Sequence, residues 1–475
     1  MRFLKTIDLI TKKEQEFISL SKKIWFHPEL RFQEHYSSKV QQDFLEENGF
    51  TITNNLADIP TAFKASFGNG SPIIGILGEF DALSNLSQKE SISYKEPHPD
   101  MENGHGCGHN LLGVGGIVSA ITLKNYLEEN RISGTIIYYG CPAEEGGSGK
   151  TFMQRAGVFN ELDLALTWHP SSINGIMSKP SLANIQASFK FRGTSSHAAI
   201  SPHLGRSALD AVELMNVGAN YLREHVTSNA RIHYAYLNTG GTSPNIVQSE
   251  AEILYLVRAP QMKECKEIFE RVKRIATGAT YMTDTTVELN FQKACSNFLP
   301  NRALEKLLHQ SLEKVGAPIP SEEETKFATE IWNSLTEEQK DNAHITNQSF
   351  GFEGNEDEFN EKPICDFISP YSGGGNDIMF GSTDVGDVSW TVPTAQLTTA
   401  CFANGTPFHS WQMVSQSNST FAFKGMISAG AVMADTAIKI FQDPELLKPI
   451  QEEFKNHISK YPYQNPIPKE VKPYF

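Results

Sequence analysis

The chain has 475 residues, of which 39% are hydrophobic and 20% are charged, and its formal net charge is −14. One hydrophobic core rarely serves a chain of this length, so we expect two domains. The acidic balance excludes nucleic acid as an expected partner, because binding to phosphates needs clustered lysine and arginine.

The N-terminal stretch and the cysteines favour a cytoplasmic protein. Residues 1–25 space their apolar side chains like an amphipathic helix, without the continuous apolar core and cleavage site of a signal peptide. No uninterrupted apolar run approaches the roughly 18 residues that a membrane span needs, so we expect no membrane contact. The six cysteines are scattered without a disulfide-like framework, as reduced thiols are.

The first third of the chain alternates strand and helix patterns. Residues 72–80 form a nearly continuous apolar run, which is typical of a buried parallel strand. Residues 111–129 carry apolar side chains at helical spacing, and β-rich runs follow at 134–140 and 162–168. This alternation predicts an α/β fold with a mainly parallel sheet.

Four polar side chains directly follow these predicted strands: Asp81, Glu144, Glu145 and His169. In parallel α/β sheets, ligands bind beyond the carboxyl ends of the strands. The shared position at strand ends therefore predicts that these four side chains line one site.

From about residue 184 the pattern changes to βαββαβ, the order of a split-βαβ or ferredoxin-like unit. The expected elements cover, in chain order, residues 184–193, 206–225, 231–238, 246–258, 263–280 and 285–292. The α/β pattern resumes near residue 301, with a strand at 395–402 and a long helix at 418–442. We therefore predict a first domain of residues 1–183 and 295–475, interrupted by an inserted domain of residues 184–294.

An acidic segment at about residues 318–362 is not explained by any motif. Residues 321–362 contain 12 acidic and 3 basic residues and so supply most of the net charge. We interpret this segment as a solvated insertion.

A glycine-rich loop at residues 103–110 carries Cys107 and, two residues later, His109. The glycines of this loop should let the backbone turn tightly enough to aim both side chains at a metal. The chain offers five metal donors in total: Cys107, His109, Glu145, His169 and His409. Five donors suffice for two divalent ions that share one ligand, and a thiolate has lone pairs for both, so Cys107 is the predicted bridge. Zinc suits the cysteine and histidines, and manganese suits carboxylates.

The adjacent carboxylates Glu144 and Glu145 should diverge in a loop, so that one binds metal while the other faces the water as a general base. Taken singly, each of these residues is more often structural. Five donors placed at strand ends favour the site. A structural zinc site, with four closely spaced ligands, is disfavoured by the spread from Cys107 to His409.

The order of four motifs resembles the aminoacylase and carboxypeptidase-G-like metallopeptidase family, in its amidohydrolase branch. The motifs are Glu79-Phe-Asp81-Ala, Gly-Cys107-Gly-His109, Ala-Glu144-Glu145-Gly-Gly and Trp-His169. The resemblance implies a dinuclear metallohydrolase domain that cleaves the amide between an acyl group and an amino acid, which we expect to be acidic. It also implies that the inserted domain is a lid that mediates dimerisation.

The resemblance assigns roles to matching residues. Cys107, His109, Glu145, His169 and His409 would be the metal ligands, Glu144 the general base, and Asp81 the group that orients a ligand. His197 would stabilise the oxyanion in the active site of the partner molecule, and Asn245 would help to hold substrate. For the substrate carboxylate we consider Arg258 and Arg206 as binding residues.

One departure and several alternatives remain at this point. Many relatives carry aspartate where this chain has Asn110, and a neutral amide should change the metal preference. A dipeptidase or general aminoacylase could use the same centre, and the chain could also be a non-catalytic subunit, which the presence of Glu144 disfavours. Both a homodimer and a heterodimer with a related protein stay open.

Overall fold

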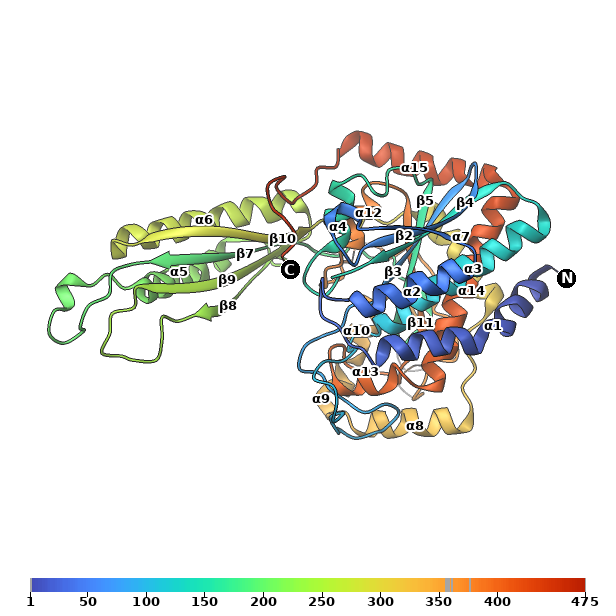
Figure 1. The fold of residues 1–475 in the computed structure, drawn as a ribbon, viewed down its shortest axis with the longest axis horizontal. Coiled ribbons are helices and arrows are strands. Elements are labelled where there is room, and N and C mark those ends of the chain that lie inside the picture. The colour runs from blue at the N-terminus through green and yellow to red at the C-terminus, as the bar shows by residue number, and fades with distance from the viewer. Residues whose placement is uncertain (1, 355–358, 360–361, 376, 475) are drawn as a thin grey trace.

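The computed structural model describes residues 2–354, 359, 362–375 and 377–474. Within these residues the chain forms a seven-stranded sheet and a separate four-stranded sheet. Figure 1 shows the larger sheet surrounded by helices and the smaller one extending away from it as an arm.

The larger sheet has the strand order β1-β2-β4-β3-β5-β11-β6, and its four central strands run parallel. The outer pairs are antiparallel. This confirms the prediction of an α/β fold with a mostly parallel central sheet. The strands are β1 (Thr51–Asn54), β2 (Phe63–Asn69), β3 (Ile73–Glu79), β4 (Gly134–Cys141), β5 (Leu164–Ser171), β6 (Gly175–Ile176) and β11 (Thr394–Ala400).

Helices cover both faces of this sheet, because alternate residues of its buried strands face opposite sides. One face packs, with Ile74 and Ile76, against the long helices, and the other packs, with Leu77 and Tyr139, around Phe152. The helices of the first face are α1 (Arg2–Trp25), α2 (His35–Glu47), α3 (His109–Asn130), α7 (Arg302–Val315), α14 (Thr420–Gln442) and α15 (Leu447–Lys460). The other short elements are η1 (Leu56–Asp58), α4 (Gly149–Arg155), α12 (Val385–Ser389), α13 (Trp411–Gln416) and η4 (Pro444–Leu446).

Helix α14 is the one described helix whose length and composition would let it cross a membrane, and 89% of its apolar window is buried inside the protein. It lies against α3, where a Cβ added at Gly430 would meet Val118 Cγ1 at 2.5 Å and the Gly115 carbonyl at 2.8 Å. Such close packing identifies α14 as a core helix.

The smaller sheet is antiparallel, with the order β10-β7-β9-β8, and α5 and α6 cover one of its faces. In chain order this is the 4-1-3-2 arrangement of the ferredoxin-like unit predicted from the sequence. The elements are β7 (Ala183–Arg192), η2 (Pro202–Leu204), α5 (Ala208–Leu222), η3 (Arg223–His225), β8 (Arg231–Asn238), β9 (Glu250–Ala259), α6 (Met262–Thr283) and β10 (Thr286–Cys295). The predicted domain boundaries and the role of this unit as a lid stay predictions.

One strand of this unit begins later than predicted. β9 starts at Glu250, because residues 246–249 pair instead with the loop after β7. The Val247 amide donates to the Ser196 carbonyl, and Ile246 forms an isolated bridge with His197.

The acidic segment is folded, so its interpretation as a solvated insertion is wrong for its inner face. It forms α8 (Glu322–Asn333), α9 (Glu337–Asp341) and α10 (Ala343–Ser349). Ala328 and Ile331 are buried in a cluster with Ile173 and Ala400 of the central domain. Four of its acidic residues, at 356–358 and 361, lie outside the described residues.

Candidate metal centre

The predicted donors lie around one cavity of about 890 Å³, between the central sheet and the base of the smaller sheet. They come from the ends of β4 and β5, the loop before α3 and the loop after β11. His169 lies two residues before the end of β5 rather than beyond it. Parallel strands thus bring residues that are far apart in sequence to one edge of the sheet.

The glycines of the 103–110 loop serve two different purposes. Gly108 has a φ of +75°, the left-handed conformation that glycine adopts without strain. Gly104 and Gly106 are needed for close approach, since an added Cβ would meet the Leu86 carbonyl at 2.3 Å or Leu86 Cδ1 at 2.7 Å. The loop is therefore pressed into the cavity wall with Cys107 at its tip.

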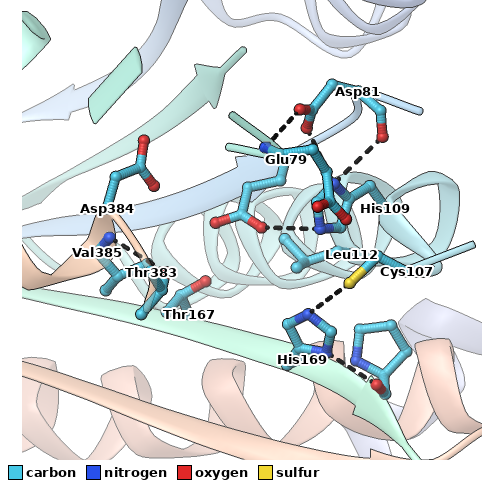
Figure 2. A network of polar contacts seen from close by, with 12 residues as sticks. Glu79, Asp81, Cys107, His109, Leu112, Thr167, His169, Thr383, Asp384 and Val385 are labelled. Atoms are coloured by element: carbon cyan, nitrogen blue, oxygen red, sulfur yellow. Dashed lines mark hydrogen bonds and ion pairs between the residues drawn. The ribbon is translucent and has the colours of Figure 1, made fainter. Parts of the chain in front are cut away.

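Two groups of three donors share Cys107. The first contains His109 and His169, and the second contains Glu145 and His409, with the donor atoms of each group within 4.8 Å of one another. Figure 2 shows the thiol of Cys107 directed at the His169 ring, whose Nε2 lies 3.5 Å away. This is the geometry that a thiolate shared by two ions would require.

Asp81 supports both groups from behind. Its Oδ1 lies 2.9 Å from His109 Nδ1, and its Oδ2 accepts a hydrogen bond of 2.8 Å from the Glu145 amide. A proton held on Nδ1 leaves Nε2 of His109 free as a metal donor. Asp81 is 1% exposed, so solvent does not compete for these bonds.

The His169 ring is oriented by its own chain neighbour. Its Nδ1 lies 2.8 Å from the Pro170 carbonyl, which leaves Nε2 facing the cavity. Burial, together with the nearby His109, lowers the pKa of His169 to about 4. The ring is therefore neutral at pH 7, the form of histidine that binds metals.

His409 is held in a strained conformation, with a φ of +58°. Its amide donates to the Gly106 carbonyl at 2.8 Å, which ties the loop after β11 to the cysteine loop. A non-glycine residue with positive φ costs roughly 1–3 kcal/mol and is concentrated at functional sites. The strain places the His409 ring 3.3 Å from Glu145 Oε1.

The donors present fit divalent metal ions. His109 Nε2 and Glu145 Oε1 are buried without a hydrogen bond, which is costly unless a ligand satisfies them. Although burial works against it, His409 and His109 lower the pKa of Glu145 to about 2, so this donor is an anion. Burial and Glu145 raise the pKa of the Cys107 thiol, so a cation beside it is needed to form the thiolate.

Glu144 lies next to the donors on a strained turn. Ala143 has a φ of +61°, and its amide donates to the buried Glu34 carboxylate at 2.9 Å. Burial and the neighbouring carboxylates Glu79 and Glu145 raise the pKa of Glu144 well above its usual range. The turn thus points Glu145 and Glu144 to different environments, as the sequence predicts for a ligand and a base.

The sequence did not identify a buried charge cluster beside the donors. Lys150 Nζ donates to Glu79 Oε1 at 2.5 Å and to Asp384 Oδ1 at 2.7 Å, and the three side chains are at most 3% exposed. The strand-end position of Glu79 could have signalled it. A single lysine in a short helix gives no such signal.

His197 and Asn245 lie outside the cavity of their own chain. Both are exposed on paired loops of the smaller sheet, where the Ala198 amide donates to the Asn245 carbonyl at 2.9 Å. Any role of these two residues in catalysis therefore requires a second chain.

The two candidate arginines differ in position. Arg206 is bonded to Asp284 at 2.8 Å on the smaller sheet's unit and does not line the cavity. Arg258 lines the cavity and donates to Ser382 Oγ at 2.9 Å. Of the two, the structure brings only Arg258 to the site.

The Asn110 amide nitrogen bonds away from the donors, to Ser21 Oγ at 3.0 Å and to the Ser417 carbonyl at 2.9 Å. It thereby joins α1 to the end of α13. Its effect on metal preference stays a prediction.

No protein-family model matches the chain. The chain is 48% identical over 469 residues to one of the two subunits of p-aminobenzoyl-glutamate hydrolase from Escherichia coli (strain K12), covering 98% of this chain and 97% of that protein. It is 26% identical over 482 residues to the human Xaa-Arg dipeptidase, covering 98% and 94%. The other polypeptide of the Escherichia coli hydrolase is 25% identical over 343 residues, covering 67% of this chain and 76% of that polypeptide.

Solved structures share the fold at low sequence identity. An aminobenzoyl-glutamate utilization protein from Klebsiella pneumoniae has a TM-score of 0.60 and 16% identity, covering 92% of this chain and 98% of that one. A dinuclear metal binding peptidase of the M20 family from Bacillus subtilis has a TM-score of 0.58 and 16% identity, covering 91% and 99%. The likeness extends over both sheets, since nine tenths of the chain is covered.

Proposed function

Because the chain belongs to the p-aminobenzoyl-glutamate hydrolase family, we propose that it hydrolyses the amide bond between an aromatic acyl group and an acidic amino acid. The proposed substrate is p-aminobenzoyl-glutamate, which yields p-aminobenzoate and glutamate. The observation that carries this proposal is the position of Glu144 in a cavity whose donors form two groups joined at Cys107.

In this proposal two divalent ions, zinc or manganese, are held by Cys107, His109, Glu145, His169 and His409. When bound, such ions lower the pKa of a water molecule and polarise the amide carbonyl. The softness of the thiol favours zinc, whereas the carboxylate also suits manganese.

Glu144 takes the proton of the attacking water and returns it to the leaving nitrogen of the amino acid. The raised pKa of Glu144 suits a group that must hold a proton between two steps. Asp81 fixes His109 and the Glu145 backbone throughout. Arg258 binds the substrate carboxylate, because its guanidinium faces the cavity with Ser382 as its side-chain partner.

An aromatic wall supports an aryl acyl group. The rings of Phe350 and Phe408 are stacked, with centroids 4.3 Å apart and an interplanar angle of 5°. Both contact the His169 ring, at 5.4 and 5.6 Å between centroids, and both line the cavity. A flat p-aminobenzoyl ring gains more from such a wall than an acetyl group does.

We further propose that the chain works as a dimer, with a second copy or with a related protein. The Escherichia coli hydrolase has two different polypeptides and both resemble this chain, which supports the heterodimer. The exposed His197 and Asn245 would then serve the partner's cavity, where an oxyanion donor contributes roughly 3 kcal/mol. A cytoplasmic location remains part of the proposal.

The runner-up is a dipeptidase, since the human Xaa-Arg dipeptidase also resembles the chain. A substrate ending in arginine would bring a cation to a cavity that Arg258, Lys293 and Arg31 already line. Like charges in a confined site repel, so an acidic amino acid fits better.

The test is release of p-aminobenzoate from p-aminobenzoyl-glutamate by the purified chain after chelation, with manganese or zinc added back. We expect turnover to vanish on chelation and to return with one of the two metals. Full turnover by the thoroughly chelated protein would refute the metal-dependent mechanism. Turnover only after addition of a related protein chain would identify the heterodimer.

A further inference from the structure

Lys293 is a cation without a partner in the catalytic cavity. It lies near the end of β10, half-buried, in register with Gln186 of β7. Within the described part of the chain it makes no hydrogen bond and no ion pair, whereas the buried Lys150 contacts two carboxylates. A half-buried ammonium loses hydration, so a vacant position beside it favours an anionic ligand.

The surroundings of Lys293 show where such an anion would come from. Burial lowers its pKa, and the charged groups that act on its amine include Glu144 and Arg258. Gln186 and Gln292, which are bonded to each other at 2.8 Å, add neutral polar groups to the same wall. Lys293 therefore belongs to the wall that holds the substrate carboxylate, close to the base.

We propose that Lys293 binds a second carboxylate of the substrate, the one on the side chain of the acidic amino acid, while Arg258 binds the α-carboxylate. This inference rests on the proposed function and extends it, because it names the residue that selects a dicarboxylate over other amino acids. Every N-acyl amino acid carries the α-carboxylate, and the planar fork of an arginine suits it. The single ammonium of Lys293 then meets the group that only acidic substrates carry.

The discrimination should be large. A site built to bind a charged substrate group leaves its own buried charge unpaired when that group is missing. Replacing the glutamate of the substrate by glutamine should therefore lower kcat/KM by about 10- to 100-fold.

The experiment compares p-aminobenzoyl-glutamate with p-aminobenzoyl-glutamine in the metal-loaded protein. In Lys293→Met, which keeps the length of the side chain, we expect kcat/KM for the glutamate substrate to fall about 10- to 100-fold, and for the glutamine substrate about twofold or less. Lys293→Arg should restore most of the preference. Lys190→Met, on the same sheet but paired with Glu250 outside the cavity, is the control and should change neither value.

Equal losses on both substrates in Lys293→Met would overturn the proposal, because they would mean that Lys293 only supports Glu144 or the fold. An unchanged ratio would overturn it as well.

If the wild-type protein hydrolyses neither substrate, the proposed function fails and binding decides the inference separately. Calorimetry with N-benzoyl-glutamate and N-benzoyl-glutamine then measures the same preference without turnover. A glutamate preference that disappears in Lys293→Met supports the subsite, and equal affinities in the wild-type protein refute it.

Discussion

At the scale of single residues, the site depends on side chains that restrict one another. Asp81 fixes a ring and a backbone amide at once, and Glu34 holds the strained Ala143 that precedes the base. Each such contact removes freedom from a donor before a ligand arrives, which is how preorganised sites avoid an entropic cost on binding. The strain at Ala143 and His409 is the price of aiming Glu144 and His409 into one cavity.

The buried Glu305 far from the site gives a residue-scale prediction about stability. Burial raises the pKa of Glu305 to about 7, although Arg302 and Tyr371 act in the opposite direction. The folded protein therefore holds a proton that the unfolded chain releases near pH 4.5, so this group's contribution to stability falls as pH rises from about 4.5 to 7. In Glu305→Gln that loss is absent.

Scanning calorimetry of wild-type and Glu305→Gln protein at pH 5 and pH 8 checks this. We expect the melting temperature of the variant, relative to wild type, to rise between these two pH values, by the equivalent of a few kcal/mol at most. Parallel pH profiles would contradict the assignment.

At the scale of elements, the strands that carry the site were predictable and the insertion was not. β3, β4 and β5 are short apolar runs bounded by turn residues, and their ends meet because the sheet is parallel. The acidic composition of residues 318–362 hid the inner face of α8, although the apolar Ala328 and Ile331 recur at helical spacing. The capping box formed by Ser321 and Glu324 was a further signal of a helix start.

Other misses have different physical causes. Lys150 and Lys293 become informative only through what the fold places beside them, and one lysine in a sequence has no pattern. Residues 246–249 read as a strand because they are apolar, yet they pair with another loop outside the sheet. The donors were found because their chemistry and their strand-end positions coincide.

The insertion leads to an element-scale prediction about the acyl group. Helix α10 is anchored by Asn347, which bonds Ser172 at 2.7 Å and Asn404 at 3.0 Å, so Phe350 after it stands on a rigid base. In Phe350→Ala we expect kcat/KM for benzoyl-glutamate to fall about tenfold and that for acetyl-glutamate to change much less, since one aromatic contact is worth about 0.5–1.5 kcal/mol. Steady-state kinetics on both substrates measures the ratio.

Phe367→Leu is the matched control, because Phe367 packs in the same cluster as Phe352 and does not line the cavity. A loss of equal size on both substrates in Phe350→Ala would show that the residue supports the fold of the insertion rather than the acyl group.

At the scale of the whole molecule, the smaller sheet extends away from the cavity and carries exposed loops (Figure 1). His197 and Asn245 on these loops cannot serve their own cavity in this arrangement, since neither lines it. Residues that act between chains would make the dimer the functional unit.

Mixing two inactive variants tests this arrangement. Glu144→Ala and His197→Ala homodimers should each be nearly inactive, whereas a mixed dimer has one site with both residues intact. After exchange of chains between equal amounts of the two variants we expect about a quarter of the wild-type activity, because half of the dimers are mixed and each has one working site. No recovery, despite proven exchange, would contradict action across the dimer.

The most direct measurement of the central claim is metal content and turnover of Glu144→Ala beside the wild-type protein. Glu144 is the base and not a ligand in this account, so the variant should bind as much metal as wild type. Its turnover of p-aminobenzoyl-glutamate should fall by about 10²- to 10⁴-fold, the contribution typical of a general base. A variant that keeps both its metal and most of its turnover would contradict the account.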